Sequence, residues 1–291
     1  MSDENAELID ALRAGPHTDL SQRATRKPDW WPAGAPKNKK AAAARLEAIS
    51  DELAELQERL FAASTAGAQD AVLLVLQGMD TAGKGGIVRH VMGLFDPQGV
   101  AHHAFKAPTP AEAKHNFLWR VKKQLPAPGH IGVFDRSHYE DVLIHKVEHL
   151  STAEQIEARY GQIVKFERQL AERGTRIIKV MLHLGSEEQF SRLAERLQRP
   201  DKYWKYDPSD VDARLAWDDY QRAYEVAIGR TSTETAPWYI VPADQKWRAR
   251  LCVAELLLHT LRQIDPAWPE ARFDVDAERR RLAAAAEAGG Q

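Results

Sequence analysis

The chain carries the sequence AVLLVLQGMDTAGKGG at residues 71–86. Its apolar part, residues 71–76, is too short for a buried helix, whereas the apolar residues from Ile87 to Phe95 recur at helical spacing. The stretch therefore predicts a strand, a loop and a helix in that order. Gly78 and Gly83 enclose four residues ahead of Lys84, which is the spacing of a phosphate-binding loop (P-loop).

A P-loop turns its backbone N–H groups toward a phosphate, and the helix that follows adds partial positive charge. A glycine-rich surface turn is the alternative, but the strand before the loop and the helix after it favour phosphate binding. The loop lysine would place a mobile charge on the phosphate oxygens. We expect the following loop residues to bind phosphate: Gly78, Ala82, Gly83, Lys84, Gly85 and Gly86.

The residue after the loop lysine is unusual. P-loop enzymes normally have a Ser or Thr there, whose hydroxyl binds Mg²⁺, but this chain has Gly85. Another oxygen must then hold the metal, and Mg²⁺ is usually held by one or two carboxylates together with water and phosphate. We expect Asp80 and Asp135 to be the metal ligands, with Mg²⁺ as the cofactor.

Composition limits the class of protein. The 291 residues and 44% hydrophobic content suit one large α/β domain with extensions. Forty basic and 42 acidic residues nearly cancel, so the net charge predicts neither nucleic-acid binding nor membrane adsorption. One cysteine, Cys252, excludes an internal disulfide. With no apolar stretch long enough to span a bilayer and no signal pattern, a cytoplasmic location is expected.

Strand and helix patterns alternate along the chain, and we expect residues 1–37 to be an extended N-terminal arm. Trp30 and Trp31 in it should pack on the protein's own surface. A domain follows over residues 38–268, beginning with an amphipathic helix at 38–63 that packs on the domain or pairs with a second subunit. A single helix starting at the capping residue Thr109 should run through Val121. Residues 269–291 form a tail.

The expected strands are residues 71–76, 100–106, 131–135, 177–184 and 238–241, with helices between them. This alternation predicts a three-layer α/β fold with a parallel five-stranded sheet. Ligands bind at the carboxyl ends of such strands, where Asp135 and Arg136 stand side by side. A carboxylate for metal beside a guanidinium for phosphate suits phosphoryl transfer. His138 could be a phosphorylated nucleophile, but direct transfer needs none, and we expect it to be structural.

A basic and aromatic cluster occupies residues 192–209. In isolation such a run is a solvated helix face, but after a P-loop and an acidic strand end it is typical of a kinase lid, which closes over phosphates and excludes water. The attraction between these cations and a bound polyanion should weaken as the salt concentration rises. The cluster contains Arg192, Arg196, Arg199, Lys202 and Lys205, with Tyr203, Trp204 and Tyr206 between them.

Four ordered motifs closely resemble the polyphosphate kinase 2 family. They are GMDTAGKGG (78–86), FDRSHYED (134–141), PDKYWK (200–205) and APWYIVPAD (236–244). The resemblance implies a homo-oligomeric (dimeric or tetrameric) P-loop kinase fold related to thymidylate kinase, with a helical lid. It also implies Mg²⁺-dependent phosphoryl transfer between inorganic polyphosphate and ADP or AMP, forming ATP or ADP.

The resemblance also implies roles for particular residues. The family's catalytic positions correspond to Asp80, Lys84, Asp135, Arg136 and Arg196, and its polyphosphate-binding lid positions to Lys202 and Lys205. Two alternatives stay open, an ATP-dependent nucleoside monophosphate kinase and a P-loop protein that binds nucleotide or polyphosphate without turnover. The missing hydroxyl after Lys84 favours the polyphosphate enzyme over the first, and retention of both carboxylates and the basic lid argues against the second.

Overall fold

A computed structural model describes residues 2–289 and contains one five-stranded sheet of strand order β2-β3-β1-β4-β5. Every neighbouring pair of strands is parallel. The five predicted strands and the parallel sheet are confirmed, with strand bounds that differ from the predicted ones by at most two residues. The strands are β1 (Ala71–Gln77), β2 (Val100–Ala104), β3 (Ile131–Asp135), β4 (Thr175–His183) and β5 (Trp238–Pro242).

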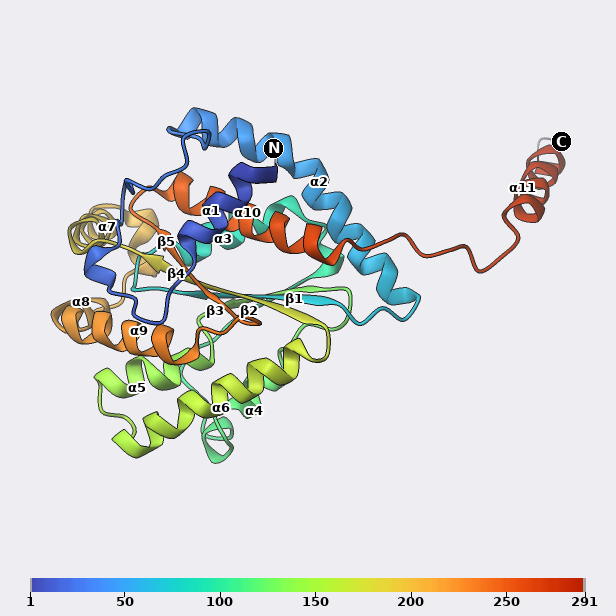
Figure 1. Ribbon diagram of the computed structural model, residues 1–291. Helices are drawn as coiled ribbons and strands as arrows, with labels where there is room; N and C mark the ends of the chain where they lie inside the picture. Colours follow the sequence, from blue (N-terminus) through green and yellow to red (C-terminus); the bar gives the residue numbers. More distant parts are fainter. Residues whose placement is uncertain (1, 290–291) are drawn as a thin grey trace.

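Helices cover both faces of the sheet (Figure 1). Side chains of a strand alternate between the faces, so Val72, Leu74 and Leu76 of β1 belong to one hydrophobic core and Leu73 and Val75 to another. The first core includes α1 (Ser2–Leu12), α2 (Lys39–Thr65), α3 (Lys84–His90) and α10 (Lys246–Ile264). The second core includes α4 (Leu118–Lys122), α6 (Ala153–Ala171) and α9 (Trp217–Thr231), and α5 (Ile144–Val147) lies on the same side.

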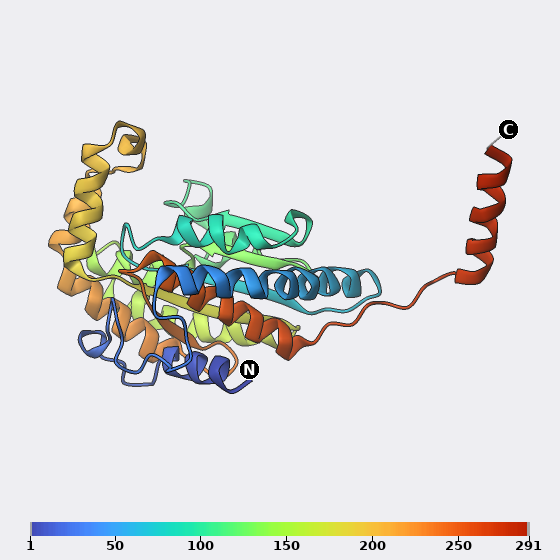
Figure 2. The same ribbon diagram turned by 90° about the horizontal axis from the view of Figure 1, so that it is seen from above.

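Helix α2 packs lengthwise on α10, so its apolar stripe is buried within this chain (Figures 1 and 2). The side chain of Asn38 caps the helix by accepting a hydrogen bond from the N–H of Ala41 at 2.9 Å. Arg45 of α2 donates to Glu255 of α10 at 2.7 Å at the edge of the contact. The stripe residues Ile49, Leu53, Leu56 and Leu60 are all buried.

The N-terminal arm is not extended over its first residues, so the prediction was wrong there. Ser2–Leu12 is helix α1, because Leu8, Ile9 and Leu12 form an apolar face that is buried against α10 and β5. The chain then runs along the body of the protein. Trp30 and Trp31 pack against the first core, as predicted for tryptophans docked on the protein's own surface.

The single helix predicted from Thr109 to beyond Val121 is also wrong. Thr109 and Glu112 do exchange the two hydrogen bonds of a capping box. The turn they begin ends at His115, whose backbone is extended, and the Asn116 side chain then accepts from the N–H of Leu118 to start α4. The competing Asn cap divides the segment into two short pieces.

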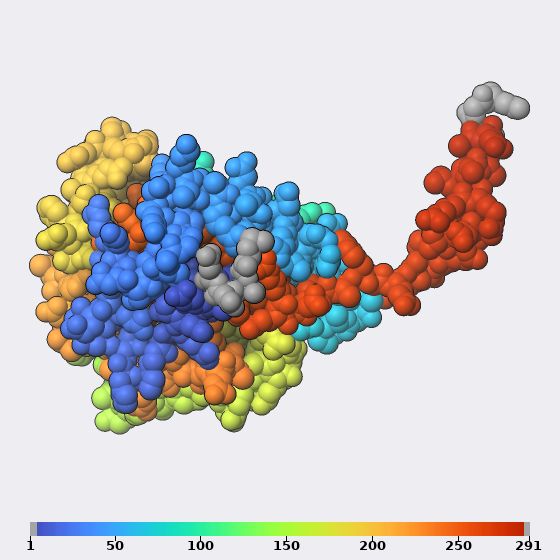
Figure 3. Space-filling view, turned by 45° about the horizontal axis from the view of Figure 1, so that its top comes forward, coloured from blue at the N-terminus to red at the C-terminus, as the bar shows by residue number. Residues whose placement is uncertain are grey.

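The last helix, α11 (Val275–Gly289), stands clear of the body at the end of an irregular segment (Figures 1 and 3). Figure 2 shows that it leaves from the end of the sheet opposite to α7 (Ser186–Gln198). Across residues 2–289, none of the helices combines the length and apolar character that crossing a membrane requires.

Candidate functional site

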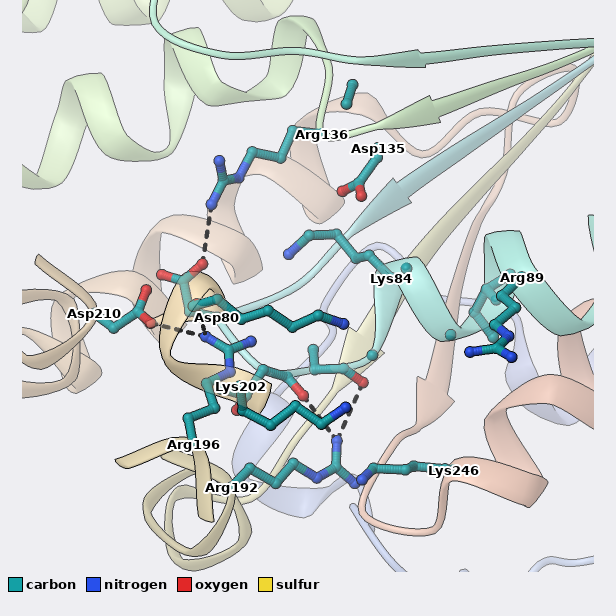
Figure 4. Close-up of a pocket in the computed structure, with 18 of the residues that line it drawn as sticks. Asp80, Lys84, Arg89, Asp135, Arg136, Arg192, Arg196, Lys202, Asp210 and Lys246 are labelled. Carbon is teal, nitrogen blue, oxygen red and sulfur yellow. Dashed lines mark hydrogen bonds and ion pairs between the residues drawn. The ribbon is translucent and has the colours of Figure 1, made fainter. Parts of the chain in front are cut away.

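A cleft of about 800 Å³ opens at the carboxyl end of the strands. The P-loop forms its floor, and the end of β3 forms part of one wall. The remaining walls come from α7, the 3-10 segment Pro200–Lys205 that follows it, and the adjoining starts of α3 and α10. Figure 4 shows the charged side chains that converge there.

The P-loop has a tightly fixed backbone. Gly78 has φ of +149°, and a Cβ there would lie 2.8 Å from the carbonyl oxygen of Leu182, so only glycine fits. Gly83 and the non-glycine Thr81 also have positive φ, +112° and +67°. Lys84 donates to the carbonyl oxygen of Gly78 at 2.8 Å, which holds its ammonium over the loop. The predicted phosphate-binding glycines and lysine thus lie together.

Asp80 and Arg136 meet across the cleft, with Arg136 Nη2 3.0 Å from Asp80 Oδ1 (Figure 4). Arg136 follows β3 in a left-handed conformation with φ of +63°. Burial disfavours its charged form, but Glu140, Asp80 and Asp135 outweigh burial and raise the pKa of the guanidinium. Burial raises the pKa of Glu140, an effect that Arg136 and Lys84 partly offset. The ionisable groups at the end of β3 therefore influence one another's pKa values.

Asp135 and Asp80 both line the cleft, and in the view of Figure 4 the side chain of Lys84 extends between their carboxylates. No group of three or more acidic, His or Cys side chains positioned to hold a metal occurs among the described residues. In that part of the chain, protein side chains alone therefore do not complete the coordination of a metal ion. Two carboxylates in an open cleft fit Mg²⁺, which commonly takes its other ligands from water and substrate phosphate.

Arg192 is a structural clamp, a role that the sequence did not indicate. Its side chain is 6% exposed, and it donates to the carbonyl oxygens of Thr81 at 2.9 Å and of Ala243 and Asp244 at 2.8 Å each. Glu188, one turn earlier on α7, accepts from its Nε at 2.8 Å. Arg192 thus ties the P-loop to α7 and to the turn before α10 (Figure 4).

Arg196 joins three segments of the basic cluster. Its Nη1 donates to the carbonyl oxygen of Lys205 at 2.8 Å and to Asp210 Oδ2 at 3.0 Å (Figure 4). Asp210 belongs to α8 (Ser209–Leu215) and is buried. Burial, and then the nearby carboxylate of Asp80, raise the pKa of Asp210 to about 6, while Arg196 opposes them. The predicted Arg196, Lys202 and Lys205 all line the cleft.

His138 does not line the cleft. Its Nε2 lies 3.2 Å from Glu167 Oε1, and the Tyr139 hydroxyl donates to the same oxygen at 2.8 Å. Lys179 donates to the other oxygen of Glu167 at 2.6 Å. Burial opposes ionisation of Glu167, but Lys179 and then His138 hold its pKa below the ordinary value. The expectation that His138 is structural agrees with this buried network behind the strand end.

Several cleft cations were missed by sequence reasoning. Arg89 lies near the end of α3, and Lys246 and Arg250 lie one turn apart at the start of α10. Lys106, just after β2, also lines the cleft. The available signal was the repeat of basic residues at four-residue spacing directly after the fifth strand, but only the tertiary packing of α10 on α3 brings it to the P-loop.

A parallel sheet, a P-loop after β1 and an acidic end of β3 beneath a basic cluster define a P-loop phosphotransferase. Residues 36–268 match the family described as Polyphosphate kinase 2, and the chain belongs to this family. The resemblance seen in the motifs is thereby confirmed.

Named relatives agree with this membership. The chain is 43% identical over 232 residues to an AMP/ADP-polyphosphate phosphotransferase from Meiothermus ruber, covering 80% of this chain and 85% of the relative. It is 41% identical to an ADP-polyphosphate phosphotransferase from Rhodopseudomonas palustris, covering 76% of this chain and 79% of the relative. The crystal structure of Polyphosphate Kinase 2 from Arthrobacter aurescens TC1 is similar with a TM-score of 0.91 at 49% identity, covering 96% of this chain and 97% of that one.

Proposed function

We propose that this protein transfers a phosphoryl group between inorganic polyphosphate and a nucleoside mono- or diphosphate, forming ADP or ATP. Membership of the polyphosphate kinase 2 family supports the reaction class, and relatives named for AMP/ADP and for ADP support the acceptors. One structural observation carries the proposal most directly. The loop lysine, two carboxylates and the strand-end arginine converge in a single cleft.

The cations of the cleft suit a transition state in which negative charge is spread over the transferring phosphoryl oxygens. Arg136 contacts Asp80 and Lys84 is held over the P-loop, so both cations are in position to neutralise that charge. Arg196 would add a third cation from α7. We assign the phosphate itself to the P-loop residues, and we assign Lys202 and Lys205 to the donor side.

Mg²⁺ would be held by Asp80 and Asp135 on the phosphate side of the cleft. When bound, the ion would neutralise phosphate oxygens and help align donor and acceptor. Asp80 is ion-paired with Arg136, so binding of a cation by Asp80 would release the guanidinium for phosphate. Removal of Asp80 should therefore have a different effect from removal of Asp135.

The lid begins beyond Arg192 in this proposal. Because Arg192 is clamped to the P-loop, the part free to move over the substrates is the tip of α7, the segment Pro200–Lys205 and α8. This tip carries Trp204, which is 78% exposed, with the Lys205 ammonium 4.8 Å from its ring centre. Closure of such a tip would exclude water from the transferring group.

A direct assay tests the function. Purified protein is incubated with Mg²⁺, long-chain polyphosphate and either ADP or AMP, and the formation of ATP or ADP is followed. The expected result is product from polyphosphate with at least one acceptor. Product from AMP only when ATP replaces polyphosphate would instead support a nucleoside monophosphate kinase. Binding of both substrates with no product from any donor would support a non-catalytic protein.

A further inference from the structure

A fully buried ion pair lies behind the end of β3. Lys179 of β4 and Glu167 of α6 are 0% and 2% exposed, and Lys179 Nζ lies 2.6 Å from Glu167 Oε2. The same ammonium donates to the Tyr139 hydroxyl at 2.9 Å and to the carbonyl oxygen of Thr231 at 2.7 Å, so its three N–H bonds are all used. Charged side chains are seldom buried completely, and a buried ion pair adds little stability compared with apolar residues of similar volume. Stability alone therefore does not explain the pair.

The ion pair holds two consecutive residues of the turn after β3. Glu167 Oε1 accepts from the Tyr139 hydroxyl at 2.8 Å and lies 3.2 Å from His138 Nε2. Both rings are buried. Ser137, just before them, accepts from Gln77 of β1 at 3.2 Å. Because two adjacent side chains end on one carboxylate oxygen, they fix both the position and the direction of the turn.

This turn begins at Arg136, where the sheet no longer supports the chain. Asp135 is still paired with β1 on one side and with β2 on the other. Arg136 donates its N–H to the carbonyl oxygen of Leu76 and has φ of +63°. A non-glycine residue stays in that conformation only where its surroundings determine it. The 3-10 segment His138–Val142 that follows therefore helps to set where the Arg136 guanidinium meets Asp80 (Figure 4).

We propose that Glu167 and Lys179 are positioning residues, which hold Arg136 in the cleft through His138 and Tyr139. The proposal rests on the proposed function, because it assigns the ion pair to a cation that neutralises the transferring phosphoryl group. These four residues are not among those that line the cleft, so they act on the reaction only through the turn. A guanidinium displaced by about 1 Å loses much of its contribution to kcat, because contacts in the transition state depend on exact position.

Replacement of both charges together provides the test, because removal of one would leave the other buried without a partner. The variant Glu167→Met/Lys179→Met fills much of the same space with two unbranched apolar side chains. Its melting temperature should stay within about 5 °C of the parent's. With polyphosphate and ADP, kcat should fall about tenfold, whereas the KM for ADP should change at most about twofold.

A double-mutant cycle measures whether the ion pair acts through Arg136. Arg136→Ala by itself should lower kcat about a hundredfold. Introduced into Arg136→Ala, the changes Glu167→Met/Lys179→Met should lower kcat by less than about a further twofold, because the guanidinium that they misplace is already gone. A loss of about tenfold in both backgrounds would overturn the proposal, since the pair would then act independently of Arg136. Parental kcat in Glu167→Met/Lys179→Met would overturn it as well.

A second variant and a matched control complete the kinetic test. Tyr139→Phe keeps both charges and removes one hydroxyl from the network. It should lower kcat about threefold in the parent but not in Arg136→Ala. The control, Arg45→Met/Glu255→Met, removes an ion pair of 2.7 Å between α2 and α10 on the other face of the sheet, where Glu255 is also buried. It should keep parental kcat, and a loss equal to that of Glu167→Met/Lys179→Met would contradict the proposal.

Hydrogen–deuterium exchange separates this proposal from the proposed function. The N–H groups of Arg136 and Leu143 donate to the carbonyl oxygens of Leu76 and Tyr139. Their exchange, read by mass spectrometry from peptides covering residues 134–143, should be at least about tenfold faster in Glu167→Met/Lys179→Met than in the parent or the control. Faster exchange supports the proposal even if the parent forms no ATP or ADP, an outcome that would refute only the function. Equal exchange in variant and parent would show that the turn holds its position without the ion pair, against the proposal.

Discussion

Two strained residues set the geometry of the site. Thr81 and Arg136 both have positive φ although neither is glycine, a conformation that costs about 1 kcal/mol or more. The hydrogen bond from the Arg136 N–H to the carbonyl oxygen of Leu76 and the Arg192 clamp on Thr81 hold them there. Asp80 and Arg136 could be assigned to one site from the sequence because parallel strands end together, but the strain could not, since it depends on these long-range bonds.

The two carboxylates should be separable by mutation. Asp80→Asn and Asp135→Asn should each lower kcat by at least about a hundredfold, because a metal ligand is lost where charge develops. Asp80→Asn also leaves Arg136 without its partner, so the KM for phosphate substrates should fall in that variant alone. Steady-state kinetics at saturating Mg²⁺ measure both effects. Asp51→Asn, an exposed change on α2, is the control, and near-parental rates in both site variants would refute the metal assignment.

Arg192 should matter for stability and for turnover together. Arg192→Met keeps the stem but leaves the carbonyl oxygens of Thr81, Ala243 and Asp244 without a donor, which should cost about 3 kcal/mol. The displaced loop should lower kcat about tenfold. Urea unfolding and initial rates measure the two effects.

The control for Arg192 is Arg199, the residue that follows the last residue of α7. Arg199→Met removes an exposed guanidinium and should change stability by less than about 0.5 kcal/mol. Arg192→Lys should restore little, because an ammonium cannot span three carbonyl oxygens as a guanidinium does. Parental stability and kcat in Arg192→Met would show that the loop holds its shape without the clamp.

At the scale of elements, regular periodicity was a reliable guide and local capping signals were not. The amphipathic helix predicted at residues 38–63 is found as α2, Lys39–Thr65, because its apolar stripe is buried against α10. The helix predicted from Thr109 is wrong because two capping residues, Thr109 and Asn116, each begin a separate helical piece. The lid cations were identified as a group from the sequence, but their pairing with Asp201 and Asp210 needed the fold.

The lid should carry an unusual dependence of stability on pH. The pKa of Asp210 is raised from 3.8 to about 6, so the folded protein binds its proton more tightly than the unfolded chain does. Stability from this group is full below about pH 4 and is lost as pH rises through about 6. Asp210→Asn should therefore gain stability relative to the parent between these values, as urea unfolding across the range would show. If the parent instead became more stable relative to Asp210→Asn as pH rises, the ion pair with Arg196 would outweigh the effects of burial and of Asp80 on Asp210.

Over the whole molecule, the N-terminal segment behaves as part of the domain. His183 Nε2 lies 3.1 Å from the carbonyl oxygens of both Leu20 and Arg23, and Thr25 donates to Asp244 at 2.8 Å, next to the Arg192 clamp. This attachment could not be predicted from the sequence, because the polar residues and prolines of the segment obscure its short apolar face. These three contacts join residues at least 160 positions apart in the sequence.

The two ends of the chain should differ sharply in their contribution to stability. Leu12→Ala removes a fully buried side chain of α1 and should lower the free energy of unfolding by about 2–5 kcal/mol. Leu282→Ala makes the same change in α11, where the side chain is 74% exposed, and should alter it by less than about 0.5 kcal/mol. Denaturant titration of both variants gives the comparison, and equal losses would show that α11 is packed in solution.

The position of α11 has a practical consequence. It leaves the body from the end of the sheet that lies away from the cleft and α7 (Figure 2). A dye, an affinity handle or a solid support joined to its exposed face would be separated from the substrates by the length of the sheet. Enzyme immobilised through this helix should present the cleft outward, so that even a long polymeric donor reaches it from open solution.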